Sequence, residues 1–203
     1  HIGSFSGPGA ATGVNLKNAS TVPADMVIIG IGIVPNTELA EAAGLTIDNG
    51  IAVDEFGRTE DPSILSAGDC TSHPNRLLGR RLRLESVHNA LEQAKTVACT
   101  ICGERAEYAQ IPWFWSDQYD IKLQIVVLSE GYDTVILRGE PASNRFSAFY
   151  LKGNKLLSVD AINSAREFML AKKLLAQGAE LDIKKLKDMS IPFKDIATAA
   201  LAE

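Results

Sequence analysis

The stretch from Arg58 to Cys70 constrains the fold of this 203-residue chain more than any other. Pro62 fixes an entry turn, and residues 64–65 are typical of a very short buried strand. That strand would deliver Gly68 and Asp69 at its carboxyl end, where open α/β sheets bind their ligands. Gly68 lets a ligand approach the backbone closely, and the Asp69 carboxylate can accept hydrogen bonds from ligand hydroxyls. A tight Gly-Asp turn without a ligand is the alternative, and the complete string favours the ligand site.

The segments before this stretch alternate between strand and helix patterns. Residues 1–11 lack an initiator Met, and we expect them to be a cloning remnant or a cut point outside the fold. Residues 12–17 alternate as a half-buried strand does, and residues 25–29 form the apolar run of a fully buried strand. A short helix is predicted from a cap at residues 36–37 to a stop at Gly44, followed by a strand over residues 50–54.

Two glycine-rich stretches fall short of a pyrophosphate-binding turn. Gly30 and Gly32 permit close backbone approach, but Pro35 stands where a third glycine belongs and the helix begins too late. Residues 7–9 follow no predicted strand. The chain therefore contains no intact dinucleotide-binding fingerprint.

Residues 84–101 form the clearest helix of the chain, ending at Gly103. Its apolar residues recur at intervals of three and four: Leu84, Val87, Leu91, Ala94, Ala98 and Ile101. The helix begins near Glu85-Ser86-Val87-His88, where unpaired N–H groups and the helix dipole favour negative charge on a ligand. A plain helix capped by Ser86 is the alternative.

The sequence changes character at Pro112, so a domain boundary is predicted within residues 104–111. Strand-like segments are followed by an amphipathic helix over residues 165–176, which predicts an antiparallel sheet with helices on one side. The strand-like segments are residues 113–115, 121–128, 134–138, 145–151 and 156–162. Gly153-Asn154 is a two-residue hairpin signal that joins the last two of these segments. Trp113 and Trp115 should face one side of their strand, where they either join the core or stack on a ligand.

Composition excludes several classes of function. A net charge of −5 gives no reason to expect nucleic acid binding, and no apolar run approaches the ~20 residues that cross a bilayer. An odd number of cysteines, 3, argues against a disulfide framework, and no secretory segment is visible. We therefore expect a cytoplasmic protein.

Four motifs in series identify a family resemblance. They are residues 29–36, the Gly-Asp string ending at Asp69, residues 85–94 and residues 113–118. Together they resemble the FAD-dependent, NADH-using ferredoxin reductases of bacterial oxygenase systems, the putidaredoxin reductase type. The resemblance implies an α/β plus α+β architecture: part of a two-dinucleotide-binding-domain flavoprotein fold, with a carboxyl-terminal domain of antiparallel sheet and helices.

The resemblance also assigns roles to residues. Asp69 would contact the ribityl chain of FAD, Val87 would reach the flavin pyrimidine through its backbone, and Trp115 would lie beside the isoalloxazine ring. The residues implied in FAD binding are Gly68, Asp69, Ser86, Val87, His88 and Trp115, and those implied in NAD binding are Gly30, Gly32 and Glu85. No side chain need act as a catalytic acid, base or nucleophile, and no metal ligand is implied.

The implied reaction is hydride transfer from NADH to FAD N5, followed by two single-electron steps to a [2Fe–2S] ferredoxin. Lys95 and the arginines within residues 76–83 would face an acidic ferredoxin. The alternative for these cations is a solvated charge run.

A full member of this family is about twice as long, with an FAD domain in two pieces around an NAD domain. The chain therefore resembles a carboxyl-terminal half. Residues 12–34 would be the tail of the NAD domain, residues 35–110 the second FAD segment, and residues 111–203 the carboxyl-terminal interface domain. We expect the isolated chain to bind FAD weakly or not at all and to lack activity. We also expect it to self-associate through apolar core exposed around Ile28, Ile29 and the helix of residues 84–101. The alternatives are a non-catalytic folded or dimerising module and, more remotely, a flavin-dependent rubredoxin or peroxide reductase.

Overall fold

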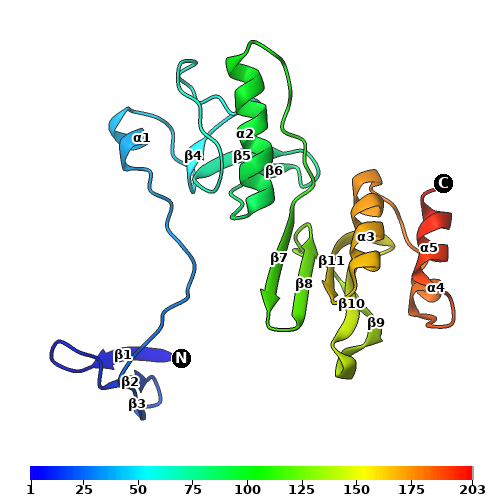
Figure 1. Cartoon of the computed structure of the whole chain (residues 1–203), viewed down its shortest axis with the longest axis horizontal. Coiled ribbons are helices and arrows are strands. Elements are labelled where there is room, and N and C mark those ends of the chain that lie inside the picture. Colours follow the sequence, from blue (N-terminus) through cyan, green and yellow to red (C-terminus); the bar gives the residue numbers. More distant parts are fainter. Residues whose placement is uncertain (203) are drawn as a thin grey trace. The chain divides into compact units, whose positions relative to one another are not determined.

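The computed structural model describes residues 1–202 and contains two compact units, His1–Val34 and Pro35–Glu203 (Figure 1). Each unit is described by itself below.

The first unit is a three-stranded antiparallel sheet in the order β1-β2-β3. Its strands are β1 (Ile2–Ser6), β2 (Gly13–Leu16) and β3 (Thr21–Pro23). The strand predicted over residues 12–17 is therefore confirmed. Residues 1–11 differ from the expectation of a remnant outside the fold, because β1 forms a ladder with β2 in which Phe5 lies opposite Val14.

The buried strand predicted over residues 25–29 is wrong. These residues adopt no regular structure, and Ile28 and Ile29 are 89% and 60% exposed. An apolar run becomes a buried strand only where neighbouring strands pair its backbone and other layers cover its side chains. Within residues 1–202 no strand pairs with this run.

The second unit begins with a small mixed α/β layer. It contains α1 (Glu38–Ala42), β4 (Ile51–Ala52), β5 (Thr71–Asn75), β6 (Arg80–Leu82) and α2 (Val87–Ile101). The strands form a sheet in the order β4-β5-β6, in which β4 and β5 are parallel and β5 and β6 antiparallel. The short helix that ends at Gly44 is confirmed, since Gly44 has φ +77° and its N–H donates to the Glu41 carbonyl.

The buried strand predicted over residues 64–65 is also wrong. Leu65 forms only an isolated bridge with Arg58, and Ile64 is 36% exposed. The Ile64 N–H donates to the Asp61 carbonyl at 3.0 Å, and Thr59 Oγ1 donates to the Ile64 carbonyl at 2.9 Å. These local bonds use the backbone groups that a ladder would need. The Gly-Asp turn therefore precedes β5 instead of following a strand.

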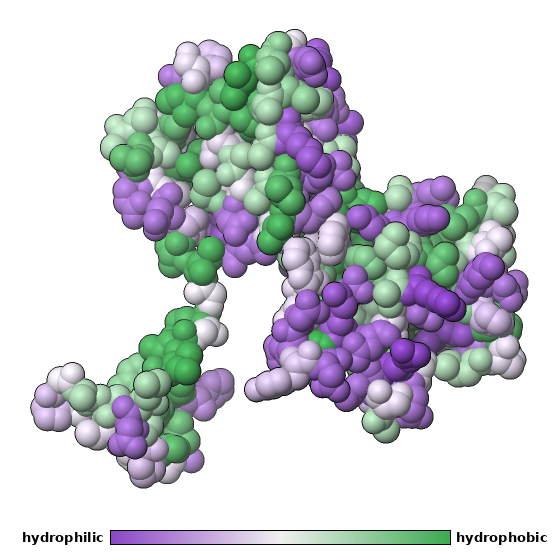
Figure 2. Space-filling view, viewed as in Figure 1, coloured by the Kyte–Doolittle hydropathy of each residue, from purple (hydrophilic) through white to green (hydrophobic). Residues whose placement is uncertain are grey.

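Helix α2 forms where predicted, and the side that it buries lies opposite its apolar stripe. Its buried residues are Asn89, Gln93 and Thr96, whereas Leu91 and Ile101 of the apolar stripe are 57% and 70% exposed. Figure 2 shows hydrophobic residues on the surface of the lobe that contains this helix. The interior face of α2 is consequently a hydrogen-bonding surface, and its apolar face is uncovered within residues 1–202.

The remainder of the second unit is a five-stranded antiparallel sheet with helices, as predicted. The strand order is β7-β8-β11-β10-β9, and the turn at Gly153-Asn154 joins β10 to β11. The strands are β7 (Trp113–Gln118), β8 (Ile121–Val126), β9 (Thr134–Glu140), β10 (Arg145–Lys152) and β11 (Lys155–Ile162). The helices are the 3₁₀ turn η1 (Pro141–Ser143), α3 (Ala165–Gln177), α4 (Ile183–Lys187) and α5 (Phe193–Ala200).

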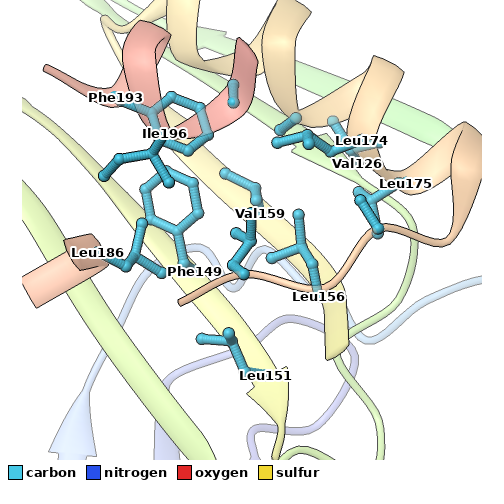
Figure 3. Close-up of a cluster of buried hydrophobic side chains, with 14 of the residues drawn as sticks. Val126, Phe149, Leu151, Leu156, Val159, Leu174, Leu175, Leu186, Phe193 and Ile196 are labelled. Carbon is cyan, nitrogen blue, oxygen red and sulfur yellow. The ribbon is translucent and has the colours of Figure 1, made fainter. Parts of the chain in front are cut away.

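The main hydrophobic core lies between this sheet and its helices. Figure 3 shows side chains of β8, β10 and β11 meeting those of α3, α4 and α5. Phe149 is fully buried, and its ring centroid lies 4.7 Å from that of Phe193. Arg138 of β9 donates at 2.6 Å to the carbonyls of Leu186 and Ile191, which ties the α4 region to the sheet.

We propose that residues 112–203 fold as an independent domain, because every fully buried member of this core lies between Val126 and Ala197. Expressed alone, this segment is expected to unfold cooperatively on heating, with a near-ultraviolet circular dichroism signal from its packed aromatic rings. A Phe149→Ala variant should lose about 3–5 kcal/mol of stability. A gradual melt of the unsubstituted segment would contradict the boundary.

Candidate functional site

The Gly68–Asp69 turn presents a carboxylate to solvent. Gly68 is buried with φ +90°, a left-handed conformation that a side chain would strain. The Thr71 N–H donates to the Gly68 carbonyl at 3.1 Å and closes the turn. Asp69 is exposed, and its carboxylate has no hydrogen bond or ion pair among residues 1–202. Two acceptor oxygens are therefore free for a ligand.

A buried polar cluster on the inner side of α2 supports this turn. Gln93 Oε1 accepts the Gly68 N–H at 2.7 Å, and Gln93 Nε2 lies 2.8 Å from His73 Nδ1. The Tyr108 hydroxyl donates to Asn89 Oδ1 at 2.8 Å. Burial, and secondarily the charge of Arg81, lowers the pKa of His73 to about 4.

The sequence-based interpretation missed this cluster. The pattern in the sequence that indicates the cluster is the recurrence of Asn89, Gln93 and Thr96 at intervals of four and three. These residues lie on the side of α2 opposite the apolar stripe.

The first turn of α2 offers free backbone donors beside the Gly68–Asp69 turn. Ser86 is the N-cap, as the plain-helix alternative predicted, and its side chain accepts from the Asn89 N–H at 3.1 Å. The N–H groups of Val87 and His88 precede the first intrahelical bond, so they have no partner within the helix. A Cβ built on Gly68 would lie 3.8 Å from Ala90 Cβ, which places the turn against α2.

Arg83 connects the Asp69 turn to Glu85. Its Nη1 donates to the Asp69 carbonyl at 3.3 Å and pairs with Glu85 Oε1 at 2.8 Å, while Nε donates to Asn49 Oδ1 at 3.3 Å. The Arg83 side chain is 10% exposed and that of Glu85 is 41% exposed. The guanidinium group therefore holds Glu85 near the turn while leaving this carboxylate partly open to solvent.

The rings of His88, Trp113 and Trp115 form an aromatic row from α2 to β7. The ring centroid of Trp113 lies 5.3 Å from that of His88, 5.2 Å from that of Trp115 and 5.5 Å from that of Phe168. The two tryptophans face the same side, as predicted. Trp113 packs against the core residue Phe168, whereas Trp115 is 40% exposed.

Two polar atoms in this row are buried without a partner among residues 1–202, His88 Nε2 and Trp113 Nε1. Burial first, and then the positive charges of Lys172 and Lys95, lower the pKa of His88 against the opposing effect of Glu92. His88 is therefore biased towards its neutral form near pH 7.

The predicted flavin residues are thus linked by contacts, from Gly68 to the first turn of α2 and from His88 through Trp113 to Trp115. Glu85 joins them through Arg83. Gly30 and Gly32 belong to the unit of residues 1–34, are exposed and lie in irregular backbone. Their role towards NAD stays a prediction.

The cations proposed to face a ferredoxin are paired with carboxylates of the same chain. The pairs are Arg76–Glu107 at 2.5 Å, Arg80–Glu130 at 2.5 Å, Arg81–Asp48 at 3.6 Å, Arg83–Glu85 at 2.8 Å and Lys95–Glu92 at 2.6 Å. This arrangement favours the alternative of a solvated charge run.

Within residues 1–202, no group of three or more His, Cys, Asp or Glu side chains is arranged to hold a metal ion. Over the same residues, every helix falls short of the length and hydropathy that a membrane crossing requires.

Comparisons with known proteins cover most of the chain. Residues 2–94 match the family described as pyridine nucleotide-disulphide oxidoreductase, and residues 113–197 match the family described as reductase C-terminal. Putidaredoxin reductase of Pseudomonas putida is 47% identical over 192 residues, which are 95% of this chain and 46% of that protein. Rhodocoxin reductase of Rhodococcus erythropolis is 42% identical over 92% of this chain and 44% of that protein.

A solved structure shows the same backbone arrangement. The crystal structure of the covalent putidaredoxin reductase–putidaredoxin complex matches with a TM-score of 0.91 and 44% identity, over 100% of this chain and 49% of that chain. The chain therefore spans about half the length of the relatives that it matches.

Proposed function

Because the chain belongs to the family of putidaredoxin reductase-type ferredoxin reductases, we propose that it is part of a flavoprotein reductase. The proposed enzyme passes electrons from NADH through FAD to a [2Fe–2S] ferredoxin. Two relatives are named as reductases of putidaredoxin and rhodocoxin, and a third as a ferredoxin–NAD(+) reductase component, which supports a ferredoxin as the electron acceptor.

The observation that carries this proposal is the free carboxylate of Asp69 in a turn that packs against the start of α2. FAD fits this arrangement, since its ribityl hydroxyls need acceptors and its ring system gathers negative charge on reduction. The buried, unpartnered Nε2 of His88 and Nε1 of Trp113 add two polar atoms that lack a protein partner among residues 1–202. We therefore assign Asp69 to the ribityl chain and the first-turn N–H groups of α2 to the pyrimidine edge.

The protein's own residues have three tasks in this site. The N–H groups of Val87 and His88 stabilise negative charge at the N-terminus of α2. Trp115 provides a partly exposed aromatic surface that shields the flavin ring from water, and the core contact of Trp113 holds it in place. Gly68 adopts the left-handed conformation in which the turn lies against α2. The bound flavin would supply the chemistry itself, which is two-electron exchange with NADH and one-electron exchange with the acceptor.

A chimera tests this function. The chain would replace the matched half of putidaredoxin reductase, so that the other half supplies what this chain lacks. The purified chimera is expected to be yellow and to reduce putidaredoxin with NADH. Asp69→Ala should weaken FAD binding by roughly 10- to 150-fold, because a charge-assisted hydrogen bond contributes about 1.5–3 kcal/mol. A folded but colourless chimera would contradict the proposal.

Tryptophan fluorescence in the same chimera tests the placement of the flavin ring. Because Trp115 is the more exposed of the two indoles, Trp115→Ala is expected to remove most of the FAD-dependent quenching. Trp113→Ala should remove less, and it is the matched control. Equal losses from the two substitutions would place the ring elsewhere.

A second candidate, a folded module that self-associates, is favoured by the uncovered apolar stripe of α2. Val87, Leu91 and Ile101 are 56%, 57% and 70% exposed. Such a stripe on a helix usually packs against another element. The two candidates are separable, because self-association of the purified chain changes its size-exclusion volume whether or not flavin is present.

A further inference from the structure

We propose that Gln93 is a positioning residue that holds the Gly68–Asp69 turn, and that His73 fixes the orientation of the Gln93 side-chain amide. The inference rests on the proposed function insofar as Asp69 is taken to contact FAD. Neither Gln93 nor His73 touches the exposed carboxylate in the arrangement described; they would act through the backbone of the turn.

Gln93 satisfies its polar side-chain atoms inside the protein. It lies on the buried side of α2 and is 4% exposed. Its Oε1 accepts the Gly68 N–H at 2.7 Å, and Thr71 Oγ1 lies 2.7 Å from the same atom and 2.9 Å from the Gly68 carbonyl. One amide oxygen therefore contacts the residues on both sides of Asp69.

The direction of the Gln93 amide follows from its partners. A backbone N–H can only donate, so the side facing Gly68 must be Oε1 and the NH₂ group must face His73. His73 Nδ1, 2.8 Å from Gln93 Nε2, must then accept, which places the imidazole proton on Nε2. His73 is 1% exposed, and its lowered pKa keeps the ring neutral at pH 7 in agreement with this tautomer.

The turn needs this support because of its backbone conformation. Gly68 has φ +90° and is buried, so its N–H cannot turn to water without opening the turn. The Thr71 N–H closes the other end of the turn at 3.1 Å, and Arg83 holds the Asp69 carbonyl at 3.3 Å. Gln93 is the contact that joins this turn to α2, whose first turn we assign to the flavin. The backbone of the turn that carries Asp69 is thereby fixed relative to α2.

The test is nuclear magnetic resonance of the 15N-labelled full chain without flavin. In Gln93→Leu, amide hydrogen exchange at Gly68 should accelerate by about fivefold or more, as expected for one lost hydrogen bond, and the Asp69 amide should become more mobile. The internal control is the Ala90 amide, which bonds to the Ser86 carbonyl at 3.0 Å and should keep its exchange rate.

Gln93→Glu separates positioning from packing. A carboxylate still accepts from Gly68 and Thr71, so protection at Gly68 should be retained. It cannot donate to His73, so the imidazole 15N signals should move from the neutral Nε2–H pattern to one with a proton on Nδ1. A merely space-filling role predicts that leucine preserves Gly68 protection as well as glutamate does.

Three outcomes would overturn the inference. They are equal acceleration of amide exchange at Gly68 and Ala90 in Gln93→Leu, loss of Gly68 protection in Gln93→Glu, and a neutral wild-type His73 ring whose proton is on Nδ1. If Gln93→Leu does not fold, Gln93→Glu and the wild-type tautomer still decide. None of these measurements involves FAD, so their failure is distinct from that of a colourless chimera.

Discussion

Calorimetric titration of the purified 203-residue chain with FAD is expected to show binding weaker than in a complete reductase by a factor on the order of 100 to a million. FAD is anchored at both ends, and its pyrophosphate requires a glycine-rich turn at a helix N-terminus. Residues 30–35 and 7–9 do not form one, since neither stretch leads from a strand into a helix. Losing two or three charge-assisted hydrogen bonds, at about 1.5–3 kcal/mol each, gives this factor.

The same preparation should show no NADH-dependent reduction of a ferredoxin. The chimera with the other half of putidaredoxin reductase is the control, because it restores the missing contacts while keeping Asp69, Val87 and Trp115. Sub-micromolar binding of FAD to the chain alone, together with turnover of NADH, would contradict this prediction. It would mean that these residues hold the cofactor without a pyrophosphate-binding turn.

Acidification from pH 7 to pH 4 is expected to reduce the stability of the α/β layer of the second unit, which contains His73, by about 2–3 kcal/mol through His73 alone. Burial, with the charge of Arg81, lowers the pKa of His73 from 6.5 to about 4 in the folded protein. Between these values the unfolded chain binds a proton that the folded chain does not. The stabilising effect is therefore complete above pH 6.5 and is lost as the pH falls towards 4.

Urea unfolding of the wild type and of His73→Asn at both pH values measures this contribution. Asn can still accept from Gln93 through its side-chain oxygen but does not titrate. Between pH 7 and pH 4 the free energy of unfolding of the variant should therefore fall by about 2–3 kcal/mol less than that of the wild type. His88→Asn is the matched control, because this ring is only half-buried and should contribute less to the loss of stability on acidification. Parallel pH profiles of the wild type and His73→Asn would contradict the prediction.

The sequence was sufficient for the family and for most of the architecture. The antiparallel sheet that begins at Trp113 and the hairpin at Gly153-Asn154 were predicted correctly because alternation and turn chemistry are local properties of the chain. The resemblance to putidaredoxin reductase-type enzymes depended on four motifs in order, and relatives at 47% and 42% identity confirm it. The roles of Asp69, Val87 and Trp115 towards FAD stay predictions.

Only the tertiary structure decided which surfaces are covered. The apolar runs at residues 25–29 and 64–65 resemble buried strands, yet within residues 1–202 no strand pairs with the first. In the second, local hydrogen bonds occupy the backbone N–H and carbonyl of Ile64. The periodicity of α2 identified a helix with an apolar stripe, and Leu91 and Ile101 of this stripe are exposed, as expected for the isolated chain. Periodicity reports that two faces differ, whereas the neighbours decide which face is buried, and here Gly68, Thr71 and His73 supply hydrogen-bonding partners for Gln93. The sequence by itself determined the residues of the Gly68–Asp69 turn, and the packing of α2 against it decided how that turn is held.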